Sequence, residues 1–124
     1  MSLSEQEIVV QPGLLKELAR ELCIKAGIPT DHAQLIADLQ VETDLRGVHS
    51  HGTRALPRYL RSIFNGDLIA DPEIKIVEEG PSYTVIDGGN GIGHPSCVYG
   101  MSKAIEKAKK TGIAATGVRN SGHY

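Results

Sequence analysis

Apolar side chains in the first quarter of the chain recur with helical spacing. They predict a helix over residues 12–26, because Gly27 is a natural C-terminal stop and Pro29 cannot continue a helix. The expected inner face carries Leu14, Leu15, Leu18, Leu22 and Ala26.

Two further helices follow from the same pattern. The second is predicted to run from Thr30, acting as the N-cap, to about Asp44, with His32 exposed in its first turn. A third is predicted to begin at Thr53 or Leu56, because a proline at position 57 suits a first helical turn. Three short helices with tight connections indicate a helical lobe. The inner faces are expected to carry Leu35, Ile36, Leu39 and Thr43 in the second helix, and Leu56, Tyr59, Leu60, Ile63 and Phe64 in the third.

The pattern changes to alternation after residue 71. Residues 73–77 alternate polar and apolar side chains, which is typical of a half-buried strand, and a turn at 79–81 leads to a second strand at 83–87. A glycine-rich loop at 88–93 and a helix from about Pro95 to Lys110 follow, then a buried strand at 113–118. The helix is expected to turn Val98, Met101, Ile105 and Ala108 inward.

These elements predict an α+β fold. Residues 1–71 form a three-helix lobe, and residues 72–124 begin an α/β domain in the order strand, strand, helix, strand. The last strand and helix make a βαβ-like crossover, which is right-handed if its strands are parallel. Because the chain stops on a polar turn just after a strand, we expect it to be a truncated or fragmentary chain.

Composition narrows the possible functions. Of 124 residues, 40% are hydrophobic and 23% are charged, with a net charge of −2, which argues against disorder and gives no nucleic-acid footprint. Apolar runs are too short for a membrane span, and the polar, acidic first seven residues are the reverse of a secretory signal. Cys23 and Cys97 belong to no motif, as in a reducing compartment, so we expect a cytoplasmic location.

Residues 44–59, at the junction of the second and third helices, concentrate the chemically active side chains. Imidazoles titrate near neutral pH, guanidinium groups clamp carboxylates, and a phenol donates a hydrogen bond. The stretch therefore predicts half of an anion-binding, proton-transferring site. Its candidate residues are Ser50, His51, Arg54, Arg58 and Tyr59.

A purely structural interpretation of this stretch stays open. In it, His49 and His51 only cap the third helix, and Arg46 pairs with a helix carboxylate such as Glu42. A metal site is not predicted, because a His-x-His pair is a weak signal and no ligand set with recognised spacing accompanies it.

The glycine-rich loop follows a strand and opens a helix, as a dinucleotide-binding loop does. However, Gly89-x-Gly91-x-Gly93 lacks the glycine that the fingerprint requires at position 94, and no acidic residue ends a second strand about 20 residues later. The sequence therefore favours an ordinary strand-to-helix turn, with His94 as a helix-start residue. His123 follows the last strand, where ligands bind in open α/β sheets, unless it is simply an exposed terminal residue.

Two blocks of the sequence resemble the malate/L-lactate dehydrogenase family, which includes ureidoglycolate and sulfolactate dehydrogenases and piperideine-2-carboxylate reductases. The first block is residues 44–52 followed by 56–59. The second comprises 85–88, 91–93, 104–108 and 118–124. Family members are longer, so the likeness covers their N-terminal part.

The resemblance implies an unusual, non-Rossmann nicotinamide-binding domain and a homodimer with active sites near the subunit interface. It also implies hydride transfer between NAD or NADP and a small 2-hydroxy or 2-oxo acid. By this resemblance, His123 and His51 are acid/base residues, with Ser50 in the same site. His123 and Ser121 are expected to contact the cofactor.

Two positions depart from the family pattern. The arginine common three residues after Ser50-His51-Gly52 is Ala55 here, so carboxylate binding is expected to fall to Arg54 or Arg58. The glutamine that often follows Gly-x-Gly is His94. The isolated 124-residue chain is expected to be inactive. The alternative is a non-catalytic interaction module or the remnant of a shortened gene.

Overall fold

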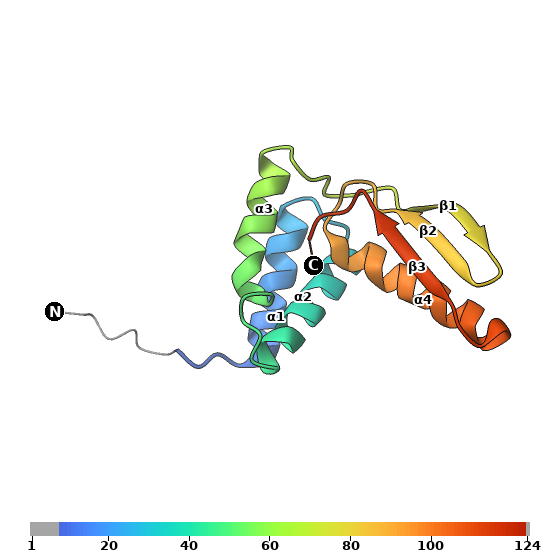
Figure 1. The fold of residues 1–124 in the computed structure, drawn as a ribbon. Helices are drawn as coiled ribbons and strands as arrows, with labels where there is room; N and C mark the ends of the chain where they lie inside the picture. The colour runs from blue at the N-terminus through green and yellow to red at the C-terminus, as the bar shows by residue number, and fades with distance from the viewer. Residues whose placement is uncertain (1–7, 124) are drawn as a thin grey trace.

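The computed structural model describes residues 8–123, which form a group of helices joined to a small sheet covered by one long helix (Figure 1). Tyr124, the last residue of the second family block, and the polar segment 1–7 lie outside the described residues. The α+β fold class is confirmed. In chain order the elements are α1 (Pro12–Lys25), α2 (Thr30–Leu45), a 3-10 turn η1 (Thr53–Ala55), α3 (Leu56–Phe64), β1 (Lys75–Gly80), β2 (Tyr83–Asp87), α4 (Gly93–Thr111) and β3 (Ala115–Arg119).

The three strands form a mixed sheet in the order β1-β2-β3. Strands β1 and β2 are an antiparallel hairpin with a register shift between Ile76 and Glu78, whereas β2 and β3 are parallel and linked through α4. The expected strand–helix–strand unit with parallel strands is therefore present. β1 starts two residues later than predicted and continues to Gly80, so the turn falls at residues 81–82 instead of 79–81.

The last strand is not buried as predicted. β3 lies at the edge of the sheet and alternates exposed and half-buried residues, and Ile113, just before it, is 77% exposed. The reason is that α4 packs on β3 while the far edge of β3 has no neighbouring strand among the described residues.

The helical core consists mainly of small side chains. Alanines and a cysteine let α1 and α2 approach closely, and Ile92, from the loop before α4, closes the same cluster. The buried residues are Ala19, Cys23, Ala26, Ile28, Ala33, Ile36, Ala37, Ala55, Leu56, Tyr59, Leu60 and Ile92.

The predicted inner face of α1 was partly wrong, although Ala26 is buried and Leu15 half-buried as expected. Leu14, Leu18 and Leu22 are 64%, 57% and 41% exposed, because the helix turns its small residues Ala19 and Cys23 toward α2.

The same error occurs in α4 and at the end of α3. Val98, Met101 and Ile105 are exposed, because α4 meets the sheet through Gly100, next to Thr116. Phe64, predicted inside, is 71% exposed.

The start of α2 also differs from the prediction. Thr30 is the first helical residue and Pro29 occupies the N-cap position without a side-chain cap. His32 is half-buried instead of exposed.

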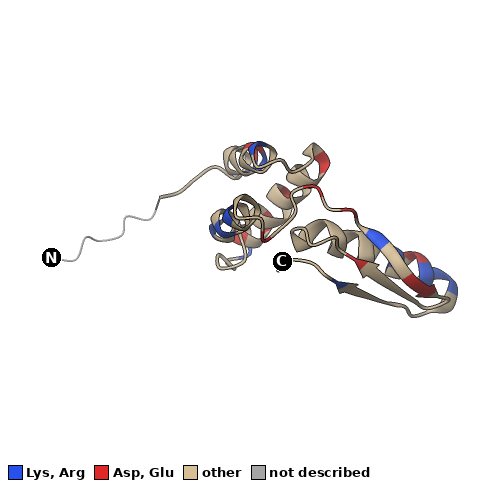
Figure 2. Ribbon diagram, turned by 90° about the horizontal axis from the view of Figure 1, so that it is seen from above, with Lys and Arg blue, Asp and Glu red and all other residues tan. Residues whose placement is uncertain are grey.

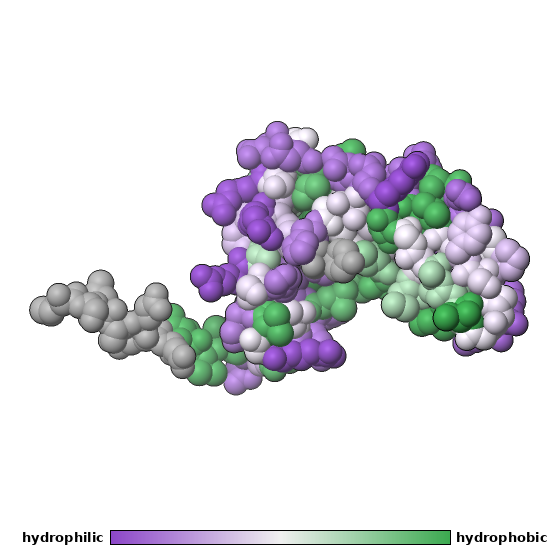
Figure 3. Space-filling model, viewed as in Figure 1, coloured by the Kyte–Doolittle hydropathy of each residue, from purple (hydrophilic) through white to green (hydrophobic). Residues whose placement is uncertain are grey.

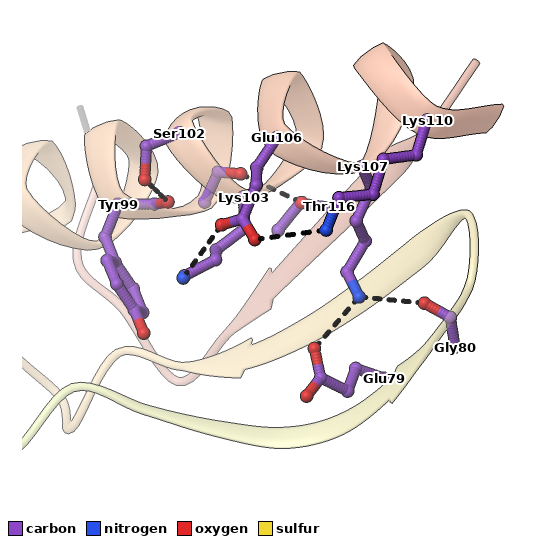
Figure 4. A network of polar contacts seen from close by, with 10 residues as sticks. Glu79, Gly80, Tyr99, Ser102, Lys103, Glu106, Lys107, Lys110 and Thr116 are labelled. Atoms are coloured by element: carbon purple, nitrogen blue, oxygen red, sulfur yellow. Dashed lines mark hydrogen bonds and ion pairs between the residues drawn. The ribbon is translucent and has the colours of Figure 1, made fainter. Parts of the chain in front are cut away.

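Residues of both charge signs lie along the far end of α4 and the β1–β2 hairpin (Figure 2). Lys107 Nζ donates to the Glu79 carboxylate at 2.9 Å and to the Gly80 carbonyl at 2.8 Å, and so ties α4 to the tip of the hairpin (Figure 4). Within residues 8–123, none of the helices has both the length and the apolar character needed to cross a membrane.

Candidate active site

The loop that carries Ser50 and His51 is anchored by Asp44 at the end of α2. The Asp44 carboxylate accepts the backbone N–H of Thr53 at 3.0 Å and its hydroxyl at 2.6 Å, and lies 3.4 Å from His49 Nδ1. Gly52 is pressed against this carboxylate so closely that a Cβ there would collide with it. Asp44 and Gly52 therefore fix where the loop begins and ends.

The imidazoles of His51 and His123 lie side by side, although they are far apart in the chain. Their ring centroids are 5.4 Å apart and their planes are tilted by 57°. Ser50 Oγ is 2.9 Å from His51 Nδ1, so the serine hydroxyl and the imidazole are hydrogen-bonded. The helix-junction loop and the segment after β3 thus bring two titratable rings to one place.

These residues border a cleft of ≈ 510 Å³ between the helical lobe and the C-terminal segment. Arg58 lies in it with its guanidinium 5.4 Å from the centre of the Tyr59 ring, whereas Arg54 is exposed on η1 and does not line it. The Tyr59 hydroxyl is buried and has no hydrogen-bond partner among the described residues. The lining residues are Ser50, His51, Arg58, Tyr59, Ser62, Asp67, Leu68, Gly122 and His123.

A third imidazole, His94, lies in the first turn of α4 behind this pair. It is 7% exposed and meets Tyr59 edge-to-face, with ring centroids 6.0 Å apart. Burial, and secondarily the charge of His123, lower the pKa of His94 from 6.5 to about 4. His94 is therefore neutral at physiological pH and starts a helix as predicted, but it also forms part of the wall behind the cleft.

The glycine-rich loop does not offer its amides to a phosphate. The N–H of Gly88 donates to Arg119, that of Gly89 to the Asp87 carboxylate, and that of Asn90 to Asn120, at 2.8–2.9 Å. Beneath the loop, Pro72 packs directly against Gly89 and Gly91. The predicted turn between strand and helix is confirmed, and the amides of residues 88–90 are already used within the chain.

Ser121 lies apart from the cleft. It borders a separate groove of ≈ 530 Å³ between α4 and β3, whose walls include Gly100, Ala104 and Ala115. The structure therefore places the two residues predicted to contact the cofactor, Ser121 and His123, on neighbouring but distinct surfaces.

The purely structural interpretation of residues 44–59, in which the histidines cap α3 and Arg46 pairs with a helix carboxylate, is correct only for Arg46. Arg46 does pair with Glu42, at 3.2 Å. However, neither His49 nor His51 caps a helix, because Asp44 takes that role at η1 and α3 has no side-chain cap. Among residues 8–123, no group of three or more His, Cys, Asp or Glu side chains is arranged to hold a metal ion.

Two residues of the site, Asp44 and His94, were not predicted from the sequence, for different reasons. The local pattern around Asp44 is that of an ordinary helix end, so its role appears only once the loop closes onto it. The histidine at position 94, where the family often has glutamine, marked this position as unusual. The sequence did not predict that His94 would be buried.

Comparison with known proteins places this geometry in context. The sequence profile of the malate/L-lactate dehydrogenase family matches residues 10–124. Malate dehydrogenase of Pyrococcus abyssi is 47% identical over 100 residues, 81% of this chain and 28% of that protein. Ureidoglycolate dehydrogenase (NAD(+)) of Escherichia coli K12 is 32% identical over 109 residues, 88% of this chain and 31% of that protein.

The structural match is equally clear. The structure of malate dehydrogenase from Pyrococcus horikoshii OT3 superposes with a TM-score of 0.92 at 40% identity, covering 100% of this chain and 36% of that one. The chain thus spans about a third of the length of the relatives it matches. On sequence and on fold, the chain belongs to the malate/L-lactate dehydrogenase family.

Proposed function

We propose that this chain supplies the acid/base half of an NAD(P)-dependent oxidoreductase acting on a small 2-hydroxy or 2-oxo acid. The observation that carries the proposal is the His51–His123 pair, with its rings 5.4 Å apart in a cleft that also contains an arginine. Family membership supports the reaction class, since the relatives are named as dehydrogenases of hydroxy acids.

Each side chain of the cleft has a role that its chemistry suits. Arg58 binds the substrate carboxylate, because a guanidinium presents a fork of N–H donors that matches a carboxylate. The Tyr59 hydroxyl, buried without a partner among the described residues, donates to a substrate oxygen. Ser50 orients His51 through the 2.9 Å hydrogen bond.

Either imidazole is placed to move the proton of the substrate hydroxyl. His123 is our first choice and His51 our second. Both rings are exposed at the cleft, and histidine is the side chain that most often serves as a general acid or base. Arg54 takes no part in this arrangement, since it does not line the cleft.

The cofactor is proposed to be NAD or NADP, which supplies or accepts the hydride when bound. The groove bordered by Ser121 is proposed to receive a ring of the cofactor, because Gly100, Ala104 and Ala115 leave space in its walls, with Met101 and Val118 beside them. Ser121 and His123 would then hold the cofactor between that groove and the cleft. The name of the Escherichia coli relative, which specifies NAD(+), supports this class of cofactor.

The remaining expectations belong to the same proposal. Residues 1–71 act as the substrate-binding lobe and residues 72–124 as the start of the cofactor domain. The complete enzyme is a homodimer with the site near the subunit interface, and it works in the cytoplasm.

The test replaces the N-terminal third of Pyrococcus abyssi malate dehydrogenase with this chain and assays a panel of 2-oxo acids with NADH and NADPH. General acid/base catalysis is worth typically ~10²–10⁴-fold in rate, so His123→Ala in this chimera should lower kcat by that order. Arg54→Ala serves as the matched control and should leave kcat/KM nearly unchanged, whereas Arg58→Ala should raise KM. Near-wild-type turnover of the His123→Ala chimera would retire the role of His123.

A second candidate function is a non-catalytic interaction module. The stripe of exposed leucines on α1, Leu14, Leu18 and Leu22, favours it, because contiguous exposed apolar side chains mark interaction sites. An active chimera whose activity depends on His123 and Arg58 would reject this candidate as the full account of the chain.

A further inference from the structure

Arg58, proposed above to bind the substrate carboxylate, leans on the ring of Tyr59. Its guanidinium carbon lies 5.4 Å from the centre of that ring, the geometry of a cation–π contact. Successive helical residues do not face each other, so the arginine side chain has to fold back over its neighbour. Arg58 is exposed, on a helix whose visible face in Figure 3 is largely hydrophilic, and none of the ion pairs among residues 8–123 includes it. The position of the guanidinium therefore depends on the position of the Tyr59 ring.

The Tyr59 ring is in turn held by the imidazole of His94, in the first turn of α4. The two rings meet edge-to-face, with centroids 6.0 Å apart and planes at 77°. Both residues are buried, at 4% and 7% exposure, so their packing restricts how each ring can turn. Tyr59 Oη and His94 Nδ1 are buried without a hydrogen-bond partner among the described residues. Packing, rather than a hydrogen bond of these atoms, therefore fixes the two rings.

His94 does not itself reach the substrate cleft. Arg58 and Tyr59 line the cleft, whereas His94 borders a different hollow, of ≈ 370 Å³ between α2 and α4, which it shares with His51. Burial holds the pKa of His94 at about 4, so its ring adds no positive charge near neutral pH. A neutral, buried ring outside the cleft acts on the substrate through a residue that it packs against, and Tyr59 is such a residue.

We propose that His94 is a positioning residue. It holds the Tyr59 ring, and through that ring the Arg58 guanidinium, where the guanidinium receives the substrate carboxylate. The contact crosses the junction of the molecule, because His94 belongs to α4 and the other two residues belong to α3. Docking of the helical lobe on the α/β half thus places the group that binds the carboxylate. The inference rests on the proposed function, which gives Arg58 its role.

The first test needs no activity and uses the 124-residue chain. Nuclear Overhauser effects between the Arg58 δ-protons and the Tyr59 ring report the cation–π contact, and His94→Ala should abolish them. His94→Gln, which also lacks a ring, should do the same, whereas His94→Phe should keep them. Ser96→Ala is the matched control, because Ser96 is buried in the same turn of α4 and its hydroxyl donates to the Gly93 carbonyl at 2.9 Å. Circular dichroism verifies that each variant folds. Effects that survive in both His94→Ala and His94→Gln, or that vanish equally in Ser96→Ala, contradict the proposal.

The second test uses the chimera with the Pyrococcus abyssi enzyme. His94→Ala should raise KM for the 2-oxo acid about two- to tenfold, the factor that corresponds to one edge-to-face ring contact. Its kcat and its KM for the nicotinamide cofactor should stay near those of the parent chimera, and Ser96→Ala should change none of the three. In an Arg58→Ala background, His94→Ala should raise KM no further, because the two residues act on the same carboxylate.

The outcomes separate this inference from the proposed function. If Arg58→Ala leaves KM unchanged, the proposed role of Arg58 fails, and the inference fails with it. If Arg58→Ala raises KM but His94→Ala does not, or if the two effects multiply, only the inference fails. A fall in kcat with KM unchanged would mean that His94 acts on the His51–His123 pair instead of Arg58, and it would equally overturn the inference.

Discussion

At the scale of single residues, His94 links the site to pH. The residue is buried, 7% exposed, and its pKa is about 4 instead of 6.5, mainly because burial disfavours the charged form. Between pH 6.5 and 4 the unfolded chain therefore binds a proton that the folded chain excludes. Stability is consequently lost as pH falls through this window and is fully present above it.

We expect this loss to be large enough to measure. The free energy of unfolding should fall by about 3 kcal/mol between pH 7 and pH 4 through His94 alone. Urea unfolding across this range measures it. In His94→Gln the loss should be reduced by that amount. Identical slopes in His94→Gln and wild type would show that His94 is not the buried proton acceptor.

Asp44 anchors the loop that carries Ser50 and His51. Removing its carboxylate in Asp44→Ala leaves the N–H and hydroxyl of Thr53 without their acceptor, which should cost about 1–3 kcal/mol of stability. The His51–His123 contact should loosen, and the nuclear Overhauser effects between the two rings should disappear. The same change at Asp38, a half-buried helix carboxylate that pairs with Lys16 away from the loop, should leave those effects intact.

Residue types in the site were predictable from the sequence, but their surroundings were not. Spacing and chemistry pointed to Ser50, His51, Arg58 and Tyr59, and all four line one cleft. Which arginine lines the cleft, Arg54 or Arg58, depends on the direction of the short 3-10 turn η1. No periodic pattern in the sequence predicts that direction.

At the scale of elements, periodicity located the helices and strands well and chose several helix faces badly. It ranks faces by hydrophobicity, so it selected Leu14, Leu18 and Leu22 in α1. Close packing instead selected Ala19 and Cys23, because small side chains allow helix axes to approach. The strand β2 was predicted to the residue, since its pattern and its glycine and proline boundaries agree.

Gly100 provides the sharpest test of the packing between α4 and the sheet. A Cβ there would lie 2.9 Å from Thr116 Cγ2 and 3.4 Å from Val118 Cγ2, so α4 must shift away from the sheet in Gly100→Val. Overpacking of this kind should cost about 1–3 kcal/mol, measured by thermal or urea unfolding. Gly13→Val, which meets no neighbouring atom within 4 Å, is the control for the loss of glycine in a helix.

At the scale of the whole molecule, the cleft exists only because the two halves of the chain are joined tightly. Ile92, in the loop before α4, is 4% exposed inside the helical cluster, while α4 itself packs on the sheet. The meeting of His51 and His123 follows from this junction. It could not be deduced from the sequence, because no local pattern specifies how the helical lobe docks on the sheet.

We therefore expect one cooperative unfolding transition for helices and sheet together. Ile92→Ala should remove about 2–5 kcal/mol, because it opens a cavity in the shared core. Hydrogen exchange should show that amides in α1 and in β2 lose protection equally. Selective loss in only one of the two elements would mean that they unfold as separate units.

The glycines of the loop at 88–93 carry a consequence for comparing sequences. Gly88, Gly89 and Gly91 are needed because Pro72, the Glu73 carbonyl and the segment after β3 crowd the loop backbone, and Gly89 has a φ of +61°. If related chains keep these glycines, the reason is crowding between neighbouring segments. The glycines would therefore be kept even in descendants that have lost all affinity for nucleotides. A dead paralogue could keep the whole Gly-rich signature for as long as it still folds.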